Sequence, residues 1–211
     1  MRRVTVDPEA PQRDAIEEAA KWILAGGIVA IPTDTLYGLA VDPFRADAVK
    51  RLFDVKGRPD DRGLPLIAAD VAQVETGMIP LPPLAVRLAE RFWPGPLTIV
   101  VPAPAALAAG VTAGSGTVAV RVPAHDVARK ICRLAGRPVT ATSANISGQH
   151  ATADPDEVER TLGDRIDLLI DTGNTPGGAP STIVDATTTE PRLIRAGAIA
   201  WNEIERCLQR G

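Results

Sequence analysis

Aromatic residues, cysteine and histidine are scarce in this chain of 211 residues, and each scarcity argues against a class of site. Aromatics make up only 3% of the chain, so platforms on which nucleic-acid bases stack are few. Cys132 and Cys207 are too few for a disulfide framework, and their spacing matches no metal motif. Since His125 and His150 are the only histidines, we expect no protein-held metal and no Ser-His-Asp triad.

A surplus of basic charge is also absent, because the formal net charge is −3. This argues against a basic face across the whole molecule but allows a local basic cleft. No segment holds about 18 uninterrupted apolar residues, so we expect no membrane span and no membrane partner. The first residues lack the apolar stretch of a signal peptide. A reducing, cytoplasmic location is the expectation.

The composition is otherwise that of a globular protein, with 45% apolar residues. No repeat or linker divides the chain, so we expect a single domain over residues 1–211. Strand patterns occur at 4–6, 28–31, 64–69, 97–101, 117–122, 138–141, 167–171, 181–185 and 192–197. Helical patterns begin near Pro11, Ala46, Leu84, Asp126, Pro155 and Trp201. Their irregular alternation predicts a mixed sheet with flanking helices, and Pro65 suggests that its strand lies at an edge.

A polar stretch, residues 32–39, directly follows the buried strand predicted at 28–31. The strand end, where α/β sheets bind ligands, carries two hydroxyls, a carboxylate and a phenol. These groups belong to Thr33, Thr35, Asp34 and Tyr37. The alternative is a turn capped by its own side chains. We favour the site, because Tyr37 is the only tyrosine and stands beside a glycine.

A basic run, Lys56-Gly57-Arg58-Pro59, follows a predicted helix, with Arg62 close behind. Arginine and lysine donors bind carboxylates and phosphates. Gly57 and Pro59 end the helix, which would place the charges on a loop. A solvated helix end that complements the helix dipole is the alternative.

Two later segments carry further candidates. Arg121 lies in a valine-rich strand and therefore needs an anionic ligand or a structural carboxylate partner. Residues 142–148 place hydroxyls, an amide and a glycine after a short strand, which can form an anion-binding nest or an ordinary loop. Residues 102–116 and 172–180 are predicted to be flexible loops.

Together these segments resemble the YrdC-like family of threonylcarbamoyl-AMP synthases. The matching runs are 32–39, 56–59, 93–98, 117–121, 143–145, 181–185 and 195–197, in register over roughly residues 10–200. The chain is similar to the short, single-domain form of that family. The resemblance implies an open, twisted mixed β-sheet with flanking helices, curled around a concave basic cleft.

The resemblance also implies a reaction. L-threonine, bicarbonate and ATP give L-threonylcarbamoyl-AMP and pyrophosphate, with Mg²⁺ accompanying the ATP substrate. A separate tRNA threonylcarbamoyl transferase then modifies adenosine 37 of tRNAs that read codons starting with A. No general base stands out, and the carbamate formed from threonine needs none.

Site residues carried over from the resemblance fall into three groups. The threonine pocket would comprise Thr35, Ile67, Arg121, Ala141 and Ser181. ATP would meet Arg58, Arg62, Thr117, Ser143, Asn145, Ala151 and Arg195. Lys56 and Arg58 would be catalytic. Many members have histidine in place of Ile67, asparagine in place of Arg62 and glutamate in place of Asp34.

The chemistry gives these cations a physical role. A threonine carbamate and ATP are both anionic, so positive groups must hold them together against repulsion. We expect Lys56, Arg58 and Arg195 to neutralise the triphosphate, and Arg121 to pair with the threonine carboxylate. Two alternatives remain: a protein whose basic cleft holds RNA phosphates without chemistry, and a nucleotide-binding relative that makes another product. Weak binding of RNA or tRNA is also expected to be compatible with the synthase itself.

Overall fold

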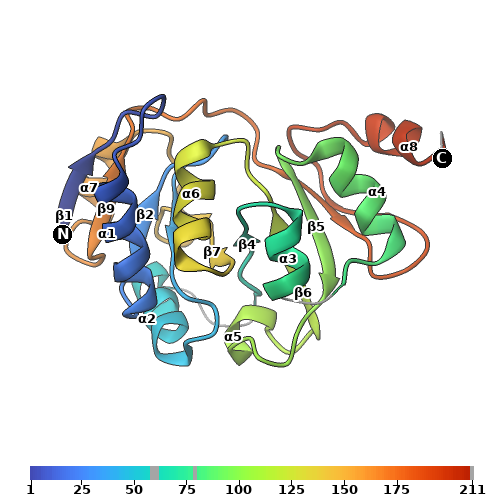
Figure 1. Ribbon diagram of the computed structural model, residues 1–211, viewed down its shortest axis with the longest axis horizontal. Helices are drawn as coiled ribbons and strands as arrows, with labels where there is room; N and C mark the ends of the chain where they lie inside the picture. The colour runs from blue at the N-terminus through green and yellow to red at the C-terminus, as the bar shows by residue number, and fades with distance from the viewer. Residues whose placement is uncertain (58–61, 78–79, 210–211) are drawn as a thin grey trace.

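The computed structural model describes residues 1–57, 62–77 and 80–209, and it confirms the expected mixed α/β fold. Arg58 lies outside the described residues. In this part of the chain the strands form two mixed sheets rather than the one sheet expected. The N-terminus and the C-terminus lie at opposite ends of the long axis (Figure 1).

The first sheet has five strands. Their order is β1 (Arg2–Thr5), β9 (Leu168–Asp171), β2 (Val29–Ile31), β3 (Gly38–Ala40) and β8 (Thr142–Ser143). The pairs β1/β9 and β9/β2 are parallel, whereas β2/β3 and β3/β8 are antiparallel. Strand β2 is buried on both faces, as its uninterrupted apolar run predicts.

The second sheet has six strands. Their order is β11 (Arg192–Arg195), β10 (Thr182–Asp185), β5 (Leu97–Pro102), β6 (Thr117–Arg121), β4 (Leu66–Ile67) and β7 (Val139–Thr140). Strand β4 pairs with both β6 and β7, so the edge position inferred from Pro65 was wrong. Pro65 precedes β4 and does not need to donate to the ladder; its carbonyl accepts a hydrogen bond from Ala141 N.

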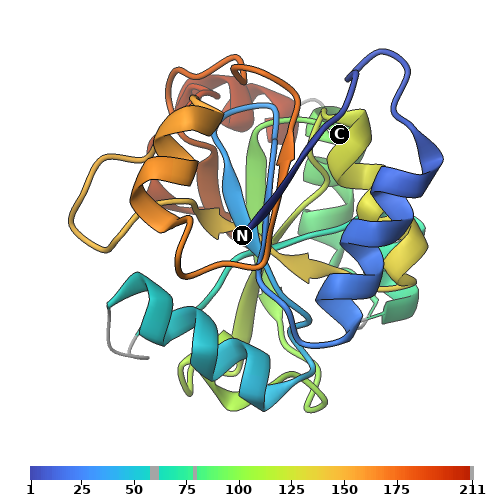
Figure 2. The ribbon, with the colours of Figure 1, turned by 90° about the vertical axis from the view of Figure 1, so that its left-hand side faces the viewer.

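Helices cover the sheets on more than one side. They are α1 (Arg13–Leu24), α2 (Ala46–Lys56), α3 (Val71–Gly77), α4 (Pro83–Phe92), α5 (Ala109–Thr112), α6 (Asp126–Ala135), α7 (Pro155–Leu162) and α8 (Trp201–Gln209). Helices α1 and α6 lie side by side (Figure 1), because Ile16, Ile23 and Ile131 share one buried cluster. Figure 2 shows α1 and α7 on opposite sides of the first sheet.

Local signals set several helix ends. Gly57 ends α2 in the left-handed conformation at φ +60°, as the basic run predicted. Asp154 caps α7 by accepting a hydrogen bond from Asp156 N. Helix α5 lies inside the segment 102–116 that was expected to be a flexible loop, and β3, β8 and α3 were not predicted.

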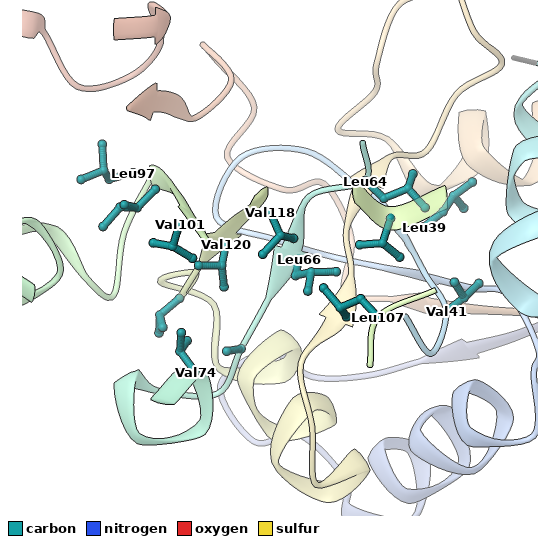
Figure 3. Close-up of a cluster of buried hydrophobic side chains, with 14 of the residues drawn as sticks. Leu39, Val41, Leu64, Leu66, Val74, Leu97, Val101, Leu107, Val118 and Val120 are labelled. Atoms are coloured by element: carbon teal, nitrogen blue, oxygen red, sulfur yellow. The ribbon is translucent and has the colours of Figure 1, made fainter. Parts of the chain in front are cut away.

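One apolar core joins the two sheets. Leu39 and Val41 come from the first sheet and its continuation, while Leu66, Val118 and Val120 come from the second (Figure 3). All belong to one cluster of buried side chains. The chain passes between the sheets at residues 140–142, where Thr140 N donates to Val41 O. This junction fixes the two sheets against each other and defines the site described next.

Candidate functional site

A cavity of about 760 Å³ lies where the two sheets meet, and we call it the main cavity. Its volume lies in the range of small-molecule sites. Its lining comes from both sheets and the loops that join them: residues 33, 35–38, 62–67, 98, 100, 111–113, 115, 117–119, 121, 141–143, 180, 181, 183, 194 and 195.

Strand alternation explains which side chains reach the main cavity. Along β5, Thr98 and Val100 line it, whereas Ile99 is fully buried in the core. Along β6, Thr117, Ala119 and Arg121 line the cavity from the face that the sequence assigned to them, and Val118 reaches it as well. Neighbouring strands therefore present their polar residues to one space.

The main cavity is positively charged. Arg62, Arg121 and Arg195 line it, and no carboxylate does within the described lining. Hydroxyls of threonine and serine residues supply most of the other polar groups. Such a surface is suited to an anionic ligand with several hydrogen-bond acceptors.

Arg195, at the end of β11, is braced by Ser181. Its Nη2 donates to Ser181 O at 2.7 Å and to Ser181 Oγ at 3.1 Å. Ser181 Oγ also lies 2.8 Å from Thr98 Oγ1, so a hydroxyl pair fixes the guanidinium against β10 and β5. Burial first, and then the positive charge of Arg121, lower the pKa of Arg195. The two guanidinium groups therefore act on the same space, and an anion between them would relieve their repulsion.

Arg121 forms the structural ion pair that the sequence left open as an alternative. Its Nη1 lies 2.7 Å from Asp34 Oδ1, with side chains that are 8% and 10% exposed. Burial lowers the pKa of Arg121, and the Asp34 carboxylate opposes that shift. The guanidinium nevertheless lines the main cavity, so pairing with Asp34 and contact with a ligand are compatible.

The stretch 33–38 lies at the cavity, as its polar residues suggested, but its phenol points elsewhere. Tyr37 is fully buried, and its hydroxyl donates to Gly173 O at 2.7 Å and accepts from Thr172 N. Tyr37 thus anchors the 172–180 loop. Thr35 holds the same loop through its carbonyl, which accepts hydrogen bonds from Thr175 Oγ1 and Gly177 N.

Lys56 lies behind the cavity wall rather than on an open loop. It is the last residue of α2 and is 2% exposed. Its Nζ donates to Ser143 O at 2.6 Å and to Asn145 O at 2.9 Å. Ser143 lines the main cavity and Lys56 does not, so the ammonium holds the wall in place from behind.

Asn145 is also part of this brace. Its side-chain amide donates to Ile146 O and Gln149 O, and its Oδ1 accepts from Ser143 Oγ. It lines a separate cavity of about 270 Å³ instead of the main cavity. Ala151 lines neither of these two cavities.

The other predicted site residues are brought together. Thr35, Ile67, Arg121, Ala141 and Ser181 all line the main cavity, as do Arg62, Thr117, Ser143 and Arg195. Thr33, which belongs to the polar stretch expected to form a site, lines it as well, whereas Thr98 and Ile194 line it and were missed. Alternation along residues 97–101 could have identified Thr98, because its neighbours on both sides are apolar.

His125 gives one testable property of this region. Burial lowers its pKa, and the carboxylates of Asp34 and Asp126 only partly oppose this. Below about pH 6.5 the His125 side chain therefore binds a proton more readily in the unfolded chain than in the folded chain. The free energy of unfolding consequently decreases as the pH falls. Between pH 7.5 and 5.5, we expect the free energy of unfolding of the wild type, measured by urea denaturation, to fall by up to about 1 kcal/mol more than that of His125→Gln. His150→Gln, at an exposed position, should show the same pH dependence of stability as the wild type. An equal pH dependence for the wild type and both variants would contradict this role of His125.

No cluster of histidine, cysteine, aspartate or glutamate that could hold a metal ion occurs in residues 1–57, 62–77 and 80–209. Cys132 is buried, and burial raises its thiol pKa to about 12, so it is not a reactive thiol. In the same ranges no helix is long and apolar enough to cross a bilayer.

The fold and the main cavity define an α/β protein with an arginine-lined cavity whose charge suits an anionic ligand. Residues 21–197 match the sequence profile of the Sua5/YciO/YrdC family, whose description is telomere recombination, and the chain belongs to this family. The resemblance noted from the sequence is thereby confirmed.

Similar proteins carry a more specific name. The threonylcarbamoyl-AMP synthase of Pyrococcus abyssi is 42% identical over 201 residues, which cover 93% of this chain and 59% of that protein. The threonylcarbamoyl-AMP synthase of Vibrio vulnificus is 39% identical over 185 residues, which cover 86% of this chain and 98% of that protein. The crystal structure of Pyrococcus abyssi Sua5 complexed with L-threonine superposes with a TM-score of 0.93 at 40% identity, covering 99% of this chain and 61% of that one. This chain thus spans about three fifths of the Pyrococcus protein.

Proposed function

We propose that this chain is a threonylcarbamoyl-AMP synthase, which makes L-threonylcarbamoyl-AMP and pyrophosphate from L-threonine, bicarbonate and ATP. The observation that carries the proposal is the main cavity, which combines three arginines with several hydroxyls and has no carboxylate in its described lining. The names of the relatives, and the threonine bound to the Pyrococcus protein, support the choice of substrates.

The reaction explains why the cavity is so positive. Bicarbonate and the threonine amine combine to a carbamate with loss of water. A carbamate oxygen then attacks the α-phosphorus of ATP, the bond to the β-phosphate oxygen breaks, and pyrophosphate leaves with its electron pair. Because both reactants are anions, arginine donors that hold them at contact distance supply most of the catalysis.

The residue roles are carried over from the family resemblance, and the lining supports them by placing most of these residues around one cavity. We assign the threonine carboxylate to Arg121, with Thr35, Ile67, Ala141 and Ser181 around the amino acid. We assign the ATP phosphates to Arg62, Thr117, Ser143 and Arg195, together with Arg58, which lies outside the described residues. The buried contacts of Lys56 and Asn145 favour a role in holding residues 143–145, and Ala151 remains a predicted ATP contact.

The setting of the reaction is part of the same proposal. The described lining offers no carboxylate cage, so Mg²⁺ would be held by the ATP phosphates and supply charge neutralisation there. The chain would fold as a single domain and act in the cytoplasm. Its product would pass to a tRNA threonylcarbamoyl transferase for modification of adenosine 37.

The test is pyrophosphate release by the purified chain, with omission of each substrate in turn. We expect release only when ATP, L-threonine and bicarbonate are all present. Release that does not need threonine would favour a different product, an outcome made plausible by Ile67 in place of the family histidine. No release, together with tight and strongly salt-dependent RNA binding, would favour the RNA-binding alternative.

A further inference from the structure

The partner of Arg121 is placed so that it touches the arginine but not the main cavity. Asp34 follows β2 in the stretch 33–38, and Arg121 ends β6 in the other sheet. Their Oδ1 and Nη1 are 2.7 Å apart. Arg121 lines the main cavity, whereas Asp34 does not, so Asp34 acts on a ligand only through Arg121.

The contact between the two is single rather than bidentate. Within the described residues, Nη1 is the only guanidinium nitrogen of Arg121 with a hydrogen-bond partner. A carboxylate that took both Nη1 and Nη2 would consume the planar fork by which arginine recognises anions. The single contact at Nη1 leaves the other edge of the guanidinium, formed by the parallel donors Nη2 and Nε, for a ligand in the cavity.

The arrangement is not one that stability alone selects. Asp34 Oδ2 and His125 Nδ1 are buried side-chain atoms without a hydrogen-bond partner among the residues that the structure describes. Buried polar atoms without partners destabilise a fold, and they concentrate where function requires them. The His125 ring lies within the electrostatic reach of Asp34, so both unpartnered atoms belong to the region around one carboxylate.

We propose that Asp34 is a positioning residue that holds the Arg121 guanidinium with its free edge toward the cavity, and so sets the affinity for the carboxylate of the amino-acid substrate. This inference rests on the proposed function. Asp34 would then have a role in substrate binding although its carboxylate does not line the main cavity.

The test compares Asp34→Asn with the wild type in steady-state pyrophosphate release. The amide keeps the size of the side chain but loses the charge that fixes Arg121. We expect the KM for L-threonine to rise about tenfold or more, with the KM for ATP and kcat within about threefold of the wild type. Arg121→Lys, which retains charge without the planar fork, should raise the same KM.

Asp42→Asn is the matched control. Asp42 is also a buried carboxylate paired with an arginine, Arg137, at 3.3 Å, and it lies outside the cavity lining. The Asp42→Asn variant should have the wild-type KM for threonine, even if the melting temperature of the variant is lower. If Asp34→Asn does not fold, Asp34→Ala replaces it, and the KM for threonine should again rise because the charge that fixes Arg121 is again missing. Asp34→Glu, which keeps the charge and is the residue that many family members carry, should leave that KM within about threefold of the wild type.

Two outcomes overturn the inference: a threonine KM in the neutral Asp34 variant within twofold of the wild type, or an equal rise in both KM values. A wild type without threonine-dependent release would instead overturn the proposed function. The inference would then be decided by calorimetry with L-threonine, where an equal Kd for wild type and variant, or no binding by either, would reject it.

Discussion

Lys56→Met should lower the melting temperature by about 5–15 °C and also abolish most of the pyrophosphate release. The substitution removes the donor to two buried carbonyls, Ser143 O and Asn145 O. Leaving buried acceptors unpaired costs about 1–3 kcal/mol each, which for a chain of this length corresponds to a shift of that order. Activity would fall because Ser143 forms part of the cavity wall.

Lys50→Met is the control for this prediction. Lys50 lies on the same helix, α2, but is exposed, so its substitution should change stability by less than about 0.5 kcal/mol. Calorimetric melts and pyrophosphate assays on both variants distinguish a lysine that supports the cavity wall from a lysine that contacts the ligand. A Lys56→Met protein that is inactive but has the melting temperature of the wild type would show that the Lys56 ammonium contacts the ligand and does not support the cavity wall.

Arg121→Met should reduce threonine-dependent turnover by about a hundredfold or more, and it should destabilise the fold. The loss of turnover follows from removing the cation that faces the amino acid. The loss of stability follows because Asp34 is left as a buried carboxylate without its partner, which costs about 3–5 kcal/mol. Both effects are read from one preparation by urea melts and steady-state kinetics.

The double variant Arg121→Met with Asp34→Asn distinguishes these two losses. Since removing both charges of a buried pair is close to neutral, most of the stability should return. Turnover should not return, because the anion receptor is still missing. Recovery of turnover in the double variant would mean that Arg121 serves the fold alone and that the amino acid binds elsewhere.

Local sequence signals account for much of the fold. Helix α1 follows from the apolar spacing of Ile16, Ala20 and Ile23, and the end of α2 follows from Gly57. The short strands β3 and β8 could not be found in this way. Their pairing is fixed by contacts between the sheets, such as Thr140 Oγ1 with the main chain of Val41, and not by a local pattern.

The site shows the same division. Residues at strand ends and on one strand face, such as Thr35 and Arg121, were predicted because alternation and polarity mark them. The direction of Lys56 and Tyr37 was not predictable, because both extend a polar tip to a main-chain partner far away in the sequence. Sequence polarity thus identifies the segment that reaches a cavity, while packing decides which of its side chains face it.

Mass spectrometry of the product formed from ATP, L-threonine and ¹³C-bicarbonate tests directly whether the cavity joins the three substrates. We expect an adenylate that contains threonine and gains about one mass unit with the labelled bicarbonate, and that falls by about a hundredfold or more in Arg121→Met. Pyrophosphate release with no carbon from bicarbonate in the adenylate would contradict this expectation.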